Sequence, residues 1–190
     1  MRELTYYVAV SLDGRIAGPG DDFSAFPVEG DHIDMILRDW RDTLPAPGLQ
    51  ALGLAADHTR FDAVVMGWGT YAAGLPHGVV DPYPHLDQVV ATRAHADHEL
   101  PDGVRATADP LAEVRRMKAQ EGVGIWLCGG GLLAASLADE IDRLVLKVNP
   151  VVLGKGPALL DGSYVPRFFE RSAVTAYDSG VVVAEYERSW

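Results

Sequence analysis

Two glycine-bearing turns, each directly behind an apolar strand-like run, constrain this chain more than any other feature. The turn 67–71 (GWGTY) follows the run 63–66, and the turn 129–131 (GGG) follows the run 124–128. A buried strand that ends in glycine and opens a helix presents bare backbone N–H groups, which most often meet a phosphate. Two such turns in one small domain therefore predict one extended, phosphate-bearing ligand such as a dinucleotide. The strict G-x-G-x-x-G fingerprint of Rossmann dehydrogenases is absent.

Length, composition and charge narrow the class of protein. The 190 residues, 48% hydrophobic and 23% charged, fit one globular domain spanning 1–190. No apolar run approaches the ~20 residues that cross a membrane, and the first residues lack the layout of a signal peptide, so we expect a cytoplasmic protein. The net charge of −11 argues against nucleic acid or an anionic membrane as a partner. The net charge does not exclude a phosphorylated cofactor, because the hydrogen-bond donors next to a phosphate decide whether it binds.

The sequence gives little support for a metal site or a disulfide bond. The single cysteine, Cys128, rules out an internal disulfide framework and paired-cysteine zinc sites, and we interpret it as a small buried residue. His95 and His98 lie in a polar loop with no third ligand at a metal-binding spacing. We therefore predict no metal site.

Strand-like and helix-like segments alternate, and the C-terminal end is rich in strands. A glycine-rich loop over 12–22 is a natural mobile segment for covering a ligand. The pattern predicts strands over 4–11, 63–66, 88–92, 124–128 and 143–149, helices over 31–42, 110–120 and 131–138, and a C-terminal hairpin of 172–177 with 181–188. The sequence thus predicts an α/β fold with a mixed, mostly parallel sheet and a C-terminal antiparallel hairpin.

Four ordered motifs carry a resemblance to a known family. They are 10–17 (VSLDGRIA), 65–71 (VMGWGTY), 127–133 (LCGGGLL) with 139–144 (DEIDRL), and 149–156 (NPVVLGKG). The chain resembles the dihydrofolate reductase-like proteins, and within them the reductase domain of bifunctional riboflavin-biosynthesis deaminase-reductases and their standalone relatives. The resemblance covers nearly the whole chain. It implies a three-layer α/β/α sandwich, and a homodimer, which is frequent among related proteins.

The resemblance implies a reductase that passes hydride from NADPH to a small pteridine- or pyrimidine-type heterocycle. It assigns the cofactor to Ala9, Gly67, Trp68, Gly69, Thr70, Thr92, Arg93, Gly129, Gly130, Gly131, Leu132 and Leu133. Thr92 and Arg93 match the position that holds the 2′-phosphate of the adenosine, which a hydroxyl beside a guanidinium suits. Folate reductases commonly carry a basic residue after the first glycine, where this chain has Trp68. The preference for NADPH over NADH therefore rests on Arg93.

The resemblance offers two carboxylates for the substrate side of the reaction. Asp13 ends the first strand, next to the expected nicotinamide position, and is the first choice for orienting substrate or loop. Asp34 is the second choice, because folate reductases place a carboxylate on the first helix to support protonation of the pterin. The simpler interpretations are that Asp13 stabilises the turn before Gly14 and that Asp34 is an ordinary exposed carboxylate.

The residues leave several functions open. The first is 5-amino-6-(5-phosphoribosylamino)uracil reductase activity, although one cysteine cannot build the zinc site of the deaminase partner domain. The alternatives are dihydrofolate reductase activity, reduction of another carbonyl or imine, and a non-catalytic nucleotide sensor on the same fold. The simpler interpretation of the glycine turns is that they are tight strand-to-helix connections. The simpler interpretation of Arg93 is that it is a solvated surface residue.

Overall fold

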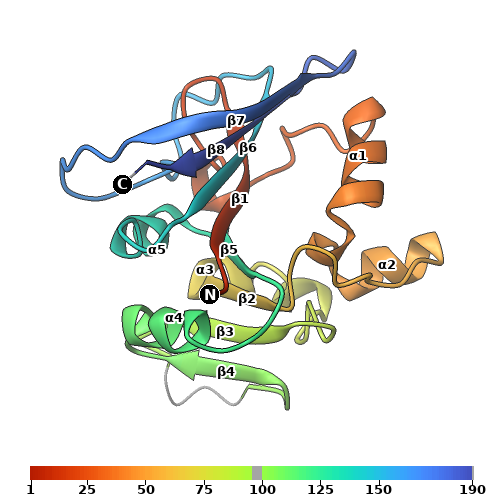
Figure 1. Cartoon of the computed structure of the whole chain (residues 1–190). Helices are drawn as coiled ribbons and strands as arrows, with labels where there is room; N and C mark the ends of the chain where they lie inside the picture. Colours follow the sequence, from red (N-terminus) through yellow and green to blue (C-terminus); the bar gives the residue numbers. More distant parts are fainter. Residues whose placement is uncertain (96–99, 190) are drawn as a thin grey trace.

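A computed structural model describes residues 1–95 and 100–189 of the chain (Figure 1). The described strands are β1 (Leu4–Ser11), β2 (Ala63–Gly67), β3 (Asp87–Ala91), β4 (Val104–Thr107), β5 (Ile125–Gly129), β6 (Arg143–Asn149), β7 (Phe169–Ala176) and β8 (Val182–Arg188). The described α-helices are α1 (Asp31–Asp39), α2 (Ala46–Leu52), α3 (Trp68–Ala72), α4 (Pro110–Lys118) and α5 (Gly131–Ser136). None of these helices is long and apolar enough to cross a membrane.

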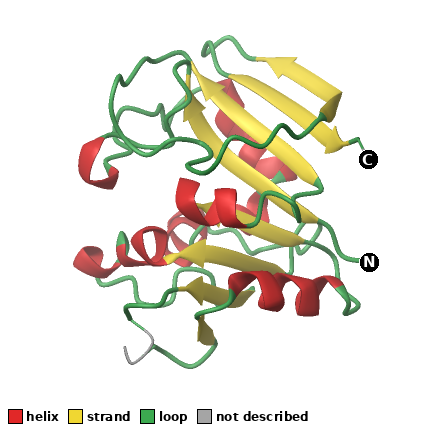
Figure 2. Ribbon diagram, turned by 90° about the vertical axis from the view of Figure 1, so that its left-hand side faces the viewer, coloured by secondary structure: helices red, strands yellow, loops and turns green. Residues whose placement is uncertain are grey.

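All the strands join one sheet in the order β4-β3-β2-β5-β1-β6-β8-β7. The first six strands in that order run parallel, and β8 and β7 return antiparallel at one edge. The predicted α/β fold with a mostly parallel sheet and a C-terminal antiparallel hairpin is confirmed. Figure 2 shows the strands crossing the molecule with helices on either side.

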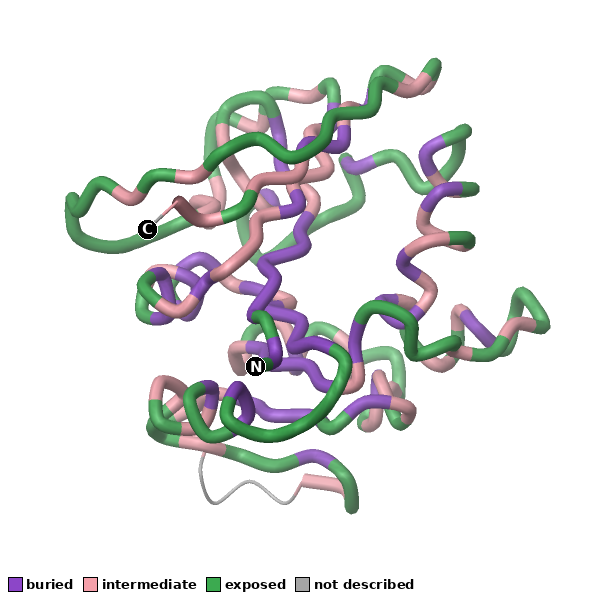
Figure 3. Tube along the Cα trace, in the orientation of Figure 1, coloured by how far each residue is buried: buried purple, intermediate pink, exposed green. Residues whose placement is uncertain are grey.

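The central strands of the sheet are buried on both faces, which explains why they read as continuous apolar runs. On one face, α4 and α5 contribute Val114, Met117 and Ala134 to a core with Leu4 and Ile125. On the other face, α1 and α3 pack with an aromatic cluster of Tyr7, Trp40, Phe61, Tyr71 and Trp126. Figure 1 shows α4 and α5 on one side of the sheet and α1 and α2 on the other, and Figure 3 shows buried residues concentrated along the central strands. These layers form the expected α/β/α sandwich.

The structure differs from the expected elements at a few places. Helix α2 fills the predicted interruption at 45–53, because Pro47 lies in its first turn, where proline is tolerated, and Gly53 ends it with φ 63°. Strand β4 was not predicted. Its sequence is short, and among the described strands it pairs with β3 alone, at the edge of the sheet. Helix α1 ends at Asp39 rather than residue 42, and its buried side chains are His32 and Met35.

The parallel strands β1 and β5 are joined over only part of their length. Their ladder covers Leu4–Tyr6 against Ile125–Leu127, whereas the ladder between β1 and β6 runs from Thr5 to Ser11. The carboxyl-terminal parts of β1 and β5 are therefore not joined by a ladder. In open α/β sheets, ligands bind at such an opening beyond the carboxyl ends of the strands.

Candidate functional site

The two glycine turns lie side by side at the carboxyl ends of neighbouring strands. Met66 of β2 pairs with Gly129 of β5, and a Cβ on Gly67 would lie 3.6 Å from the backbone nitrogen of Gly130. The Gly129–Gly130 peptide bond is cis. The structure thus brings together the two segments that the sequence analysis assigned to one ligand.

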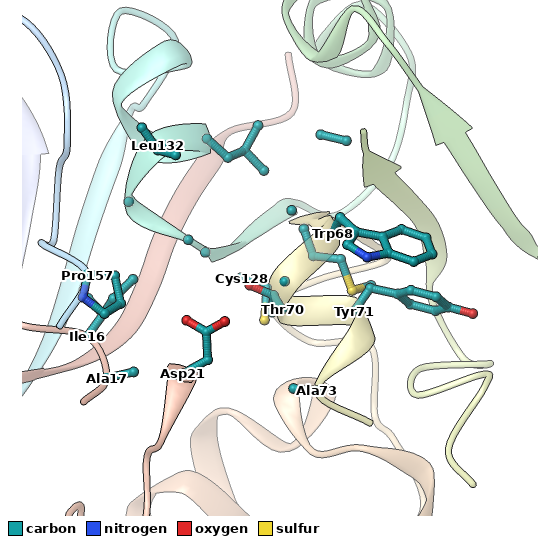
Figure 4. Close-up of a pocket in the computed structure, with 18 of the residues that line it drawn as sticks. Ile16, Ala17, Asp21, Trp68, Thr70, Tyr71, Ala73, Cys128, Leu132 and Pro157 are labelled. Carbon is teal, nitrogen blue, oxygen red and sulfur yellow. The ribbon is translucent and has the colours of Figure 1, made fainter. Parts of the chain in front are cut away.

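A cavity of about 860 Å³ opens at these turns (Figure 4). It is lined by every residue that the sequence analysis assigned to the cofactor except Ala9: Gly67, Trp68, Gly69, Thr70, Thr92, Arg93, Gly129, Gly130, Gly131, Leu132 and Leu133. Pockets of this size hold drug-sized ligands and cofactors. Ala9 lies half-buried in β1, paired with Lys147 of β6.

The glycines of the two turns are required for different reasons. A Cβ on Gly131 would lie 2.0 Å from the carbonyl oxygen of Ala158, so close packing against the loop after β6 demands glycine there. Gly129 has φ +128°, a conformation that other residues rarely adopt. A Cβ on Gly69 would meet only the Asp21 carboxylate, at 3.4 Å, and Gly69 is exposed toward the cavity. Of these three glycines, Gly69 is therefore the one whose missing side chain leaves room for a ligand.

The outer wall of the cavity combines aromatic rings with a cation. The rings of Trp68 and His95 stack with centroids 3.9 Å apart and planes 2° from parallel. Thr92 follows β3, and its Oγ1 accepts a hydrogen bond from the backbone N–H of His95 at 3.1 Å. Arg93 is exposed at the cavity. Of the two histidines weighed as metal ligands, His98 lies outside the described residues.

The loop 12–22 forms a further wall, as its sequence predicted. Ile16, Ala17 and Asp21 line the cavity, and Figure 4 shows the Asp21 carboxylate pointing into it. Asp21 has φ 59°, which is uncommon for a residue other than glycine. Asp21 was not predicted as a site residue. The loop repeats Gly and Asp, and this pattern does not indicate which side chain points into the cavity.

Asp13 fastens two loops to each other. Its carboxylate accepts hydrogen bonds from the Ser11 hydroxyl at 2.6 Å and from the backbone N–H groups of Leu153 at 3.0 Å and Gly154 at 2.8 Å. These bonds, that of Ser11 foremost, lower the pKa of the Asp13 carboxyl to about 2. Asp13 lies outside the cavity lining, and its contacts are those of a positioning residue for the loop after β6.

Asp34 and Cys128 differ in their relation to the cavity. Asp34 is exposed on α1 and is not part of the cavity lining. Cys128 lines the cavity, and burial raises the pKa of its thiol to about 12, so it stays protonated. This thiol therefore behaves as a small apolar residue, in line with its sequence interpretation.

The cavity has the chemistry that a dinucleotide cofactor requires. Both turn helices have glycine at the N-cap position, so no side chain of the cap residue satisfies their first backbone amides. The Arg93 guanidinium stands near one end, and apolar walls from Val8, Met66 and Leu133 continue inward. Backbone donors and a guanidinium can hold phosphates, and an apolar surface can hold rings.

The sequence matches a known family over almost its whole length. The matching family is described as the RibD C-terminal domain, and the match covers residues 2–183. The chain belongs to the RibD C-terminal domain family. A relative from Bacillus subtilis (strain 168), the uncharacterized protein YwjB, is 29% identical over 160 residues, covering 82% of this chain and 80% of YwjB.

Solved structures share the fold of this RibD C-terminal domain protein. A putative riboflavin biosynthesis protein from Shewanella sp. PV-4 matches over 100% of both chains with TM-score 0.66 and 22% identity. A Thermotoga maritima diaminohydroxyphosphoribosylaminopyrimidine deaminase/5-amino-6-(5-phosphoribosylamino)uracil reductase gives TM-score 0.68 at 17% identity, and the alignment spans 99% of this chain and 57% of that protein. Enterococcus faecalis dihydrofolate reductase, complexed with NADP(H) and RAB-propyl, gives TM-score 0.65 at 15% identity over 99% of this chain and 97% of that chain. The dihydrofolate reductase-like fold is thereby established.

Proposed function

We propose that this protein is an NADPH-dependent reductase that transfers hydride to a small pyrimidine- or pteridine-type heterocycle. The observation that carries the proposal is the convergence of both glycine turns and the Thr92–Arg93 segment on one cavity of about 860 Å³. Family membership and the reductases among the structural neighbours support it. The preferred substrate is 5-amino-6-(5-phosphoribosylamino)uracil, the compound named for the Thermotoga maritima protein.

The chain's own residues divide the work of binding. NADPH, when bound, supplies the hydride, so the protein has to orient the two rings and exclude water. The backbone of the two turns would hold the diphosphate, and Thr92 with Arg93 would hold the 2′-phosphate. Trp68, stacked on His95, presents a flat apolar wall. Asp21 points into the cavity, where its carboxylate can accept hydrogen bonds from ribose hydroxyls.

Dihydrofolate as the substrate is the second candidate within the same reaction class. Folate reductases use a carboxylate on the first helix that faces the pterin, and Asp34 is the residue that the sequence offers for it. Asp34 is exposed and lies outside the cavity lining. We therefore rank the phosphoribosylamino-pyrimidine above dihydrofolate.

The deciding experiment is a fluorescence titration with NADPH and NADH on the wild type, Arg93→Ala and the control Arg38→Ala. Arg38 is exposed on α1, outside the cavity. Loss of a charge-assisted contact to the 2′-phosphate should weaken NADPH binding by about 1.5–3 kcal/mol, roughly 10- to 150-fold, without affecting NADH. Arg38→Ala should match the wild type.

Other results of the titration would count against the role of Arg93, against the reductase proposal, or in favour of the sensor alternative. An Arg93→Ala variant that keeps the wild-type preference would remove Arg93 from the 2′-phosphate site. Wild-type protein that binds neither cofactor would refute the reductase proposal. Tight NADPH binding without oxidation of NADPH by either proposed substrate or by a panel of carbonyl and imine heterocycles would favour the sensor alternative.

A further inference from the structure

Lys147 is a cation on an interior strand of the sheet, one strand away from the opening between β1 and β5. It lies on the interior strand β6, where it pairs with Ala9 of β1 and Val183 of β8. Alternation along the strand puts Lys147 on the same face as Val145, which belongs to the aromatic core cluster on the α1 side. Ala9, its neighbour, is the one residue assigned to the cofactor that lies outside the cavity lining. Its small side chain leaves space beside Lys147.

The contacts of the Lys147 ammonium group are aromatic and neutral. Its Nζ lies 4.1 Å from the centroid of the Tyr7 ring, and that ring is itself stacked on Trp40 at 4.5 Å. The positive charge also acts on the Cys128 thiol, which lines the cavity. Because that thiol stays protonated, it cannot serve as a counterion.

No carboxylate among the described residues lies within ion-pair distance of Lys147. Glu185 lies on β8, two residues after Val183, and therefore on the same face of the sheet as Lys147. Its carboxylate accepts a hydrogen bond from the Arg143 guanidinium at 3.2 Å. Burial lowers the pKa of the Lys147 ammonium to about 8, so the group is still largely charged at neutral pH. A partly desolvated cation that has only ring and thiol contacts leaves donors available for a ligand oxygen or nitrogen.

We propose that Lys147 binds the substrate, donating a hydrogen bond to the heteroatom of the C=N or C=O bond that accepts the hydride. The inference rests on the proposed reductase function and identifies the substrate side of the site. Lys147 itself lies outside the cavity lining, and its charge acts on Cys128, which is a lining residue, so the substrate atom that Lys147 contacts would lie on the Cys128 side of the cavity.

The position gives Lys147 a defined chemical task. As hydride adds to the carbon, the π electrons of the C=N or C=O bond move to the heteroatom, which gains negative charge. The Lys147 ammonium donates a proton to that atom, and the resulting amine regains a proton from water, since Lys147 is only partly buried. The substrate is reduced and the nicotinamide cofactor is oxidised, with the proton supplied by solvent through the lysine.

A kinetic test compares wild type, Lys147→Met, Lys147→Arg and the control Lys155→Met, which removes an exposed lysine outside the cavity. With NADPH and 5-amino-6-(5-phosphoribosylamino)uracil, Lys147→Met should lose about 100-fold in kcat/KM. Its NADPH affinity and unfolding midpoint should stay close to those of the wild type. Lys147→Arg should recover part of the lost rate, and Lys155→Met should match the wild type. A Lys147→Met variant with wild-type kcat/KM would overturn the inference while leaving the proposed function intact.

A second readout does not depend on turnover. The chain has only three lysines, Lys118, Lys147 and Lys155, so isotope labelling of lysine gives three side-chain signals, and Lys147→Met identifies one of them. Addition of the same pyrimidine should shift the Lys147 signal and leave the other two in place. If the wild type does not oxidise NADPH, the proposed function fails, yet a shifted Lys147 signal still supports the binding site. A Lys147 signal unmoved up to saturating pyrimidine, in active or inactive protein, refutes it.

Discussion

At the scale of single residues, the carboxylates show how contacts decide a role that residue type leaves open. Asp13 and Asp34 were selected because a reductase of this kind needs an acidic group near its substrate. In the structure, the Asp13 carboxylate accepts hydrogen bonds from Ser11, Leu153 and Gly154, whereas Asp34 is exposed. Asp21, which no motif marked, is the carboxylate that points into the cavity. A direct role of Asp13 or Asp34 in the reaction stays a prediction.

The low pKa of Asp13 predicts a pH dependence of the loop after β6. The pKa of about 2 lies below the ~3.9 of an unfolded aspartate, so the stabilisation is complete above pH ~4 and is lost as the pH falls toward 2. Hydrogen exchange of the Leu153 and Gly154 amides should accelerate over that range, relative to amides in β1. Asp13→Asn should exchange faster at every pH above 4. Equal protection of both amides in wild type and variant would contradict the fastening role.

At the scale of elements, each glycine turn serves both packing and ligand access, and the two requirements fall on different residues. Helix α5 approaches the loop after β6 so closely at Gly131 that a Cβ has no room. Helix α3 presents Gly69 toward the cavity, where a Cβ meets only the end of the Asp21 side chain. The plain interpretation of a tight connection therefore holds for Gly131, and the ligand interpretation stays open for Gly69.

Two alanine variants separate these requirements. Gly131→Ala should destabilise the fold by about 2 kcal/mol, since it forces a Cβ onto the Ala158 carbonyl. Gly69→Ala should leave stability unchanged or raise it by up to about 1 kcal/mol, because alanine favours a helix. Its NADPH affinity should fall roughly tenfold, about 1.4 kcal/mol. Thermal unfolding and cofactor titration of both proteins check this, and a Gly69→Ala variant that binds NADPH like the wild type would argue against phosphate approach at α3.

At the scale of the whole molecule, the C-terminal hairpin leaves one edge of the sheet uncovered. Seven of the eight residues of β7 are exposed, and Phe168 directly before it is 75% exposed. In the described part of the chain, β7 pairs with β8 alone. An exposed edge strand with apolar side chains is a ready surface for pairing with another chain.

We expect this edge to join two copies of the chain, as the family resemblance implies. Light scattering should give twice the chain mass of 20.5 kDa. Val174→Lys, at a β7 position that is 51% exposed, should shift the protein to the monomer. Val80→Lys serves as the matched control, since Val80 is 50% exposed in a loop away from β7. A wild-type monomer at all concentrations, or a Val174→Lys dimer, would exclude pairing through β7.

The sequence by itself determined the fold class and the two glycine turns that line the cavity. Continuous or alternating apolar residues are local signals, so β1 over Leu4–Ser11 and β6 over Arg143–Asn149 were predicted to the residue. The resemblance then placed Thr92, Arg93 and both turns, all of which line the cavity. The strands and the glycine turns follow from hydrophobic periodicity and backbone chemistry, which neighbouring residues carry, whereas Thr92 and Arg93 follow from the family resemblance alone.

Only the tertiary structure decided which side chains face the cavity and which fasten loops together. Two partners of Asp13, Leu153 and Gly154, lie about 140 positions away in the sequence, and the neighbours of Lys147 lie on β1 and β8. Helix α2 and strand β4 likewise depend on packing that no local pattern specifies. Contacts between distant segments set burial, hydrogen bonding and charge compensation, and these determine whether an aspartate or a lysine holds the fold or meets a substrate.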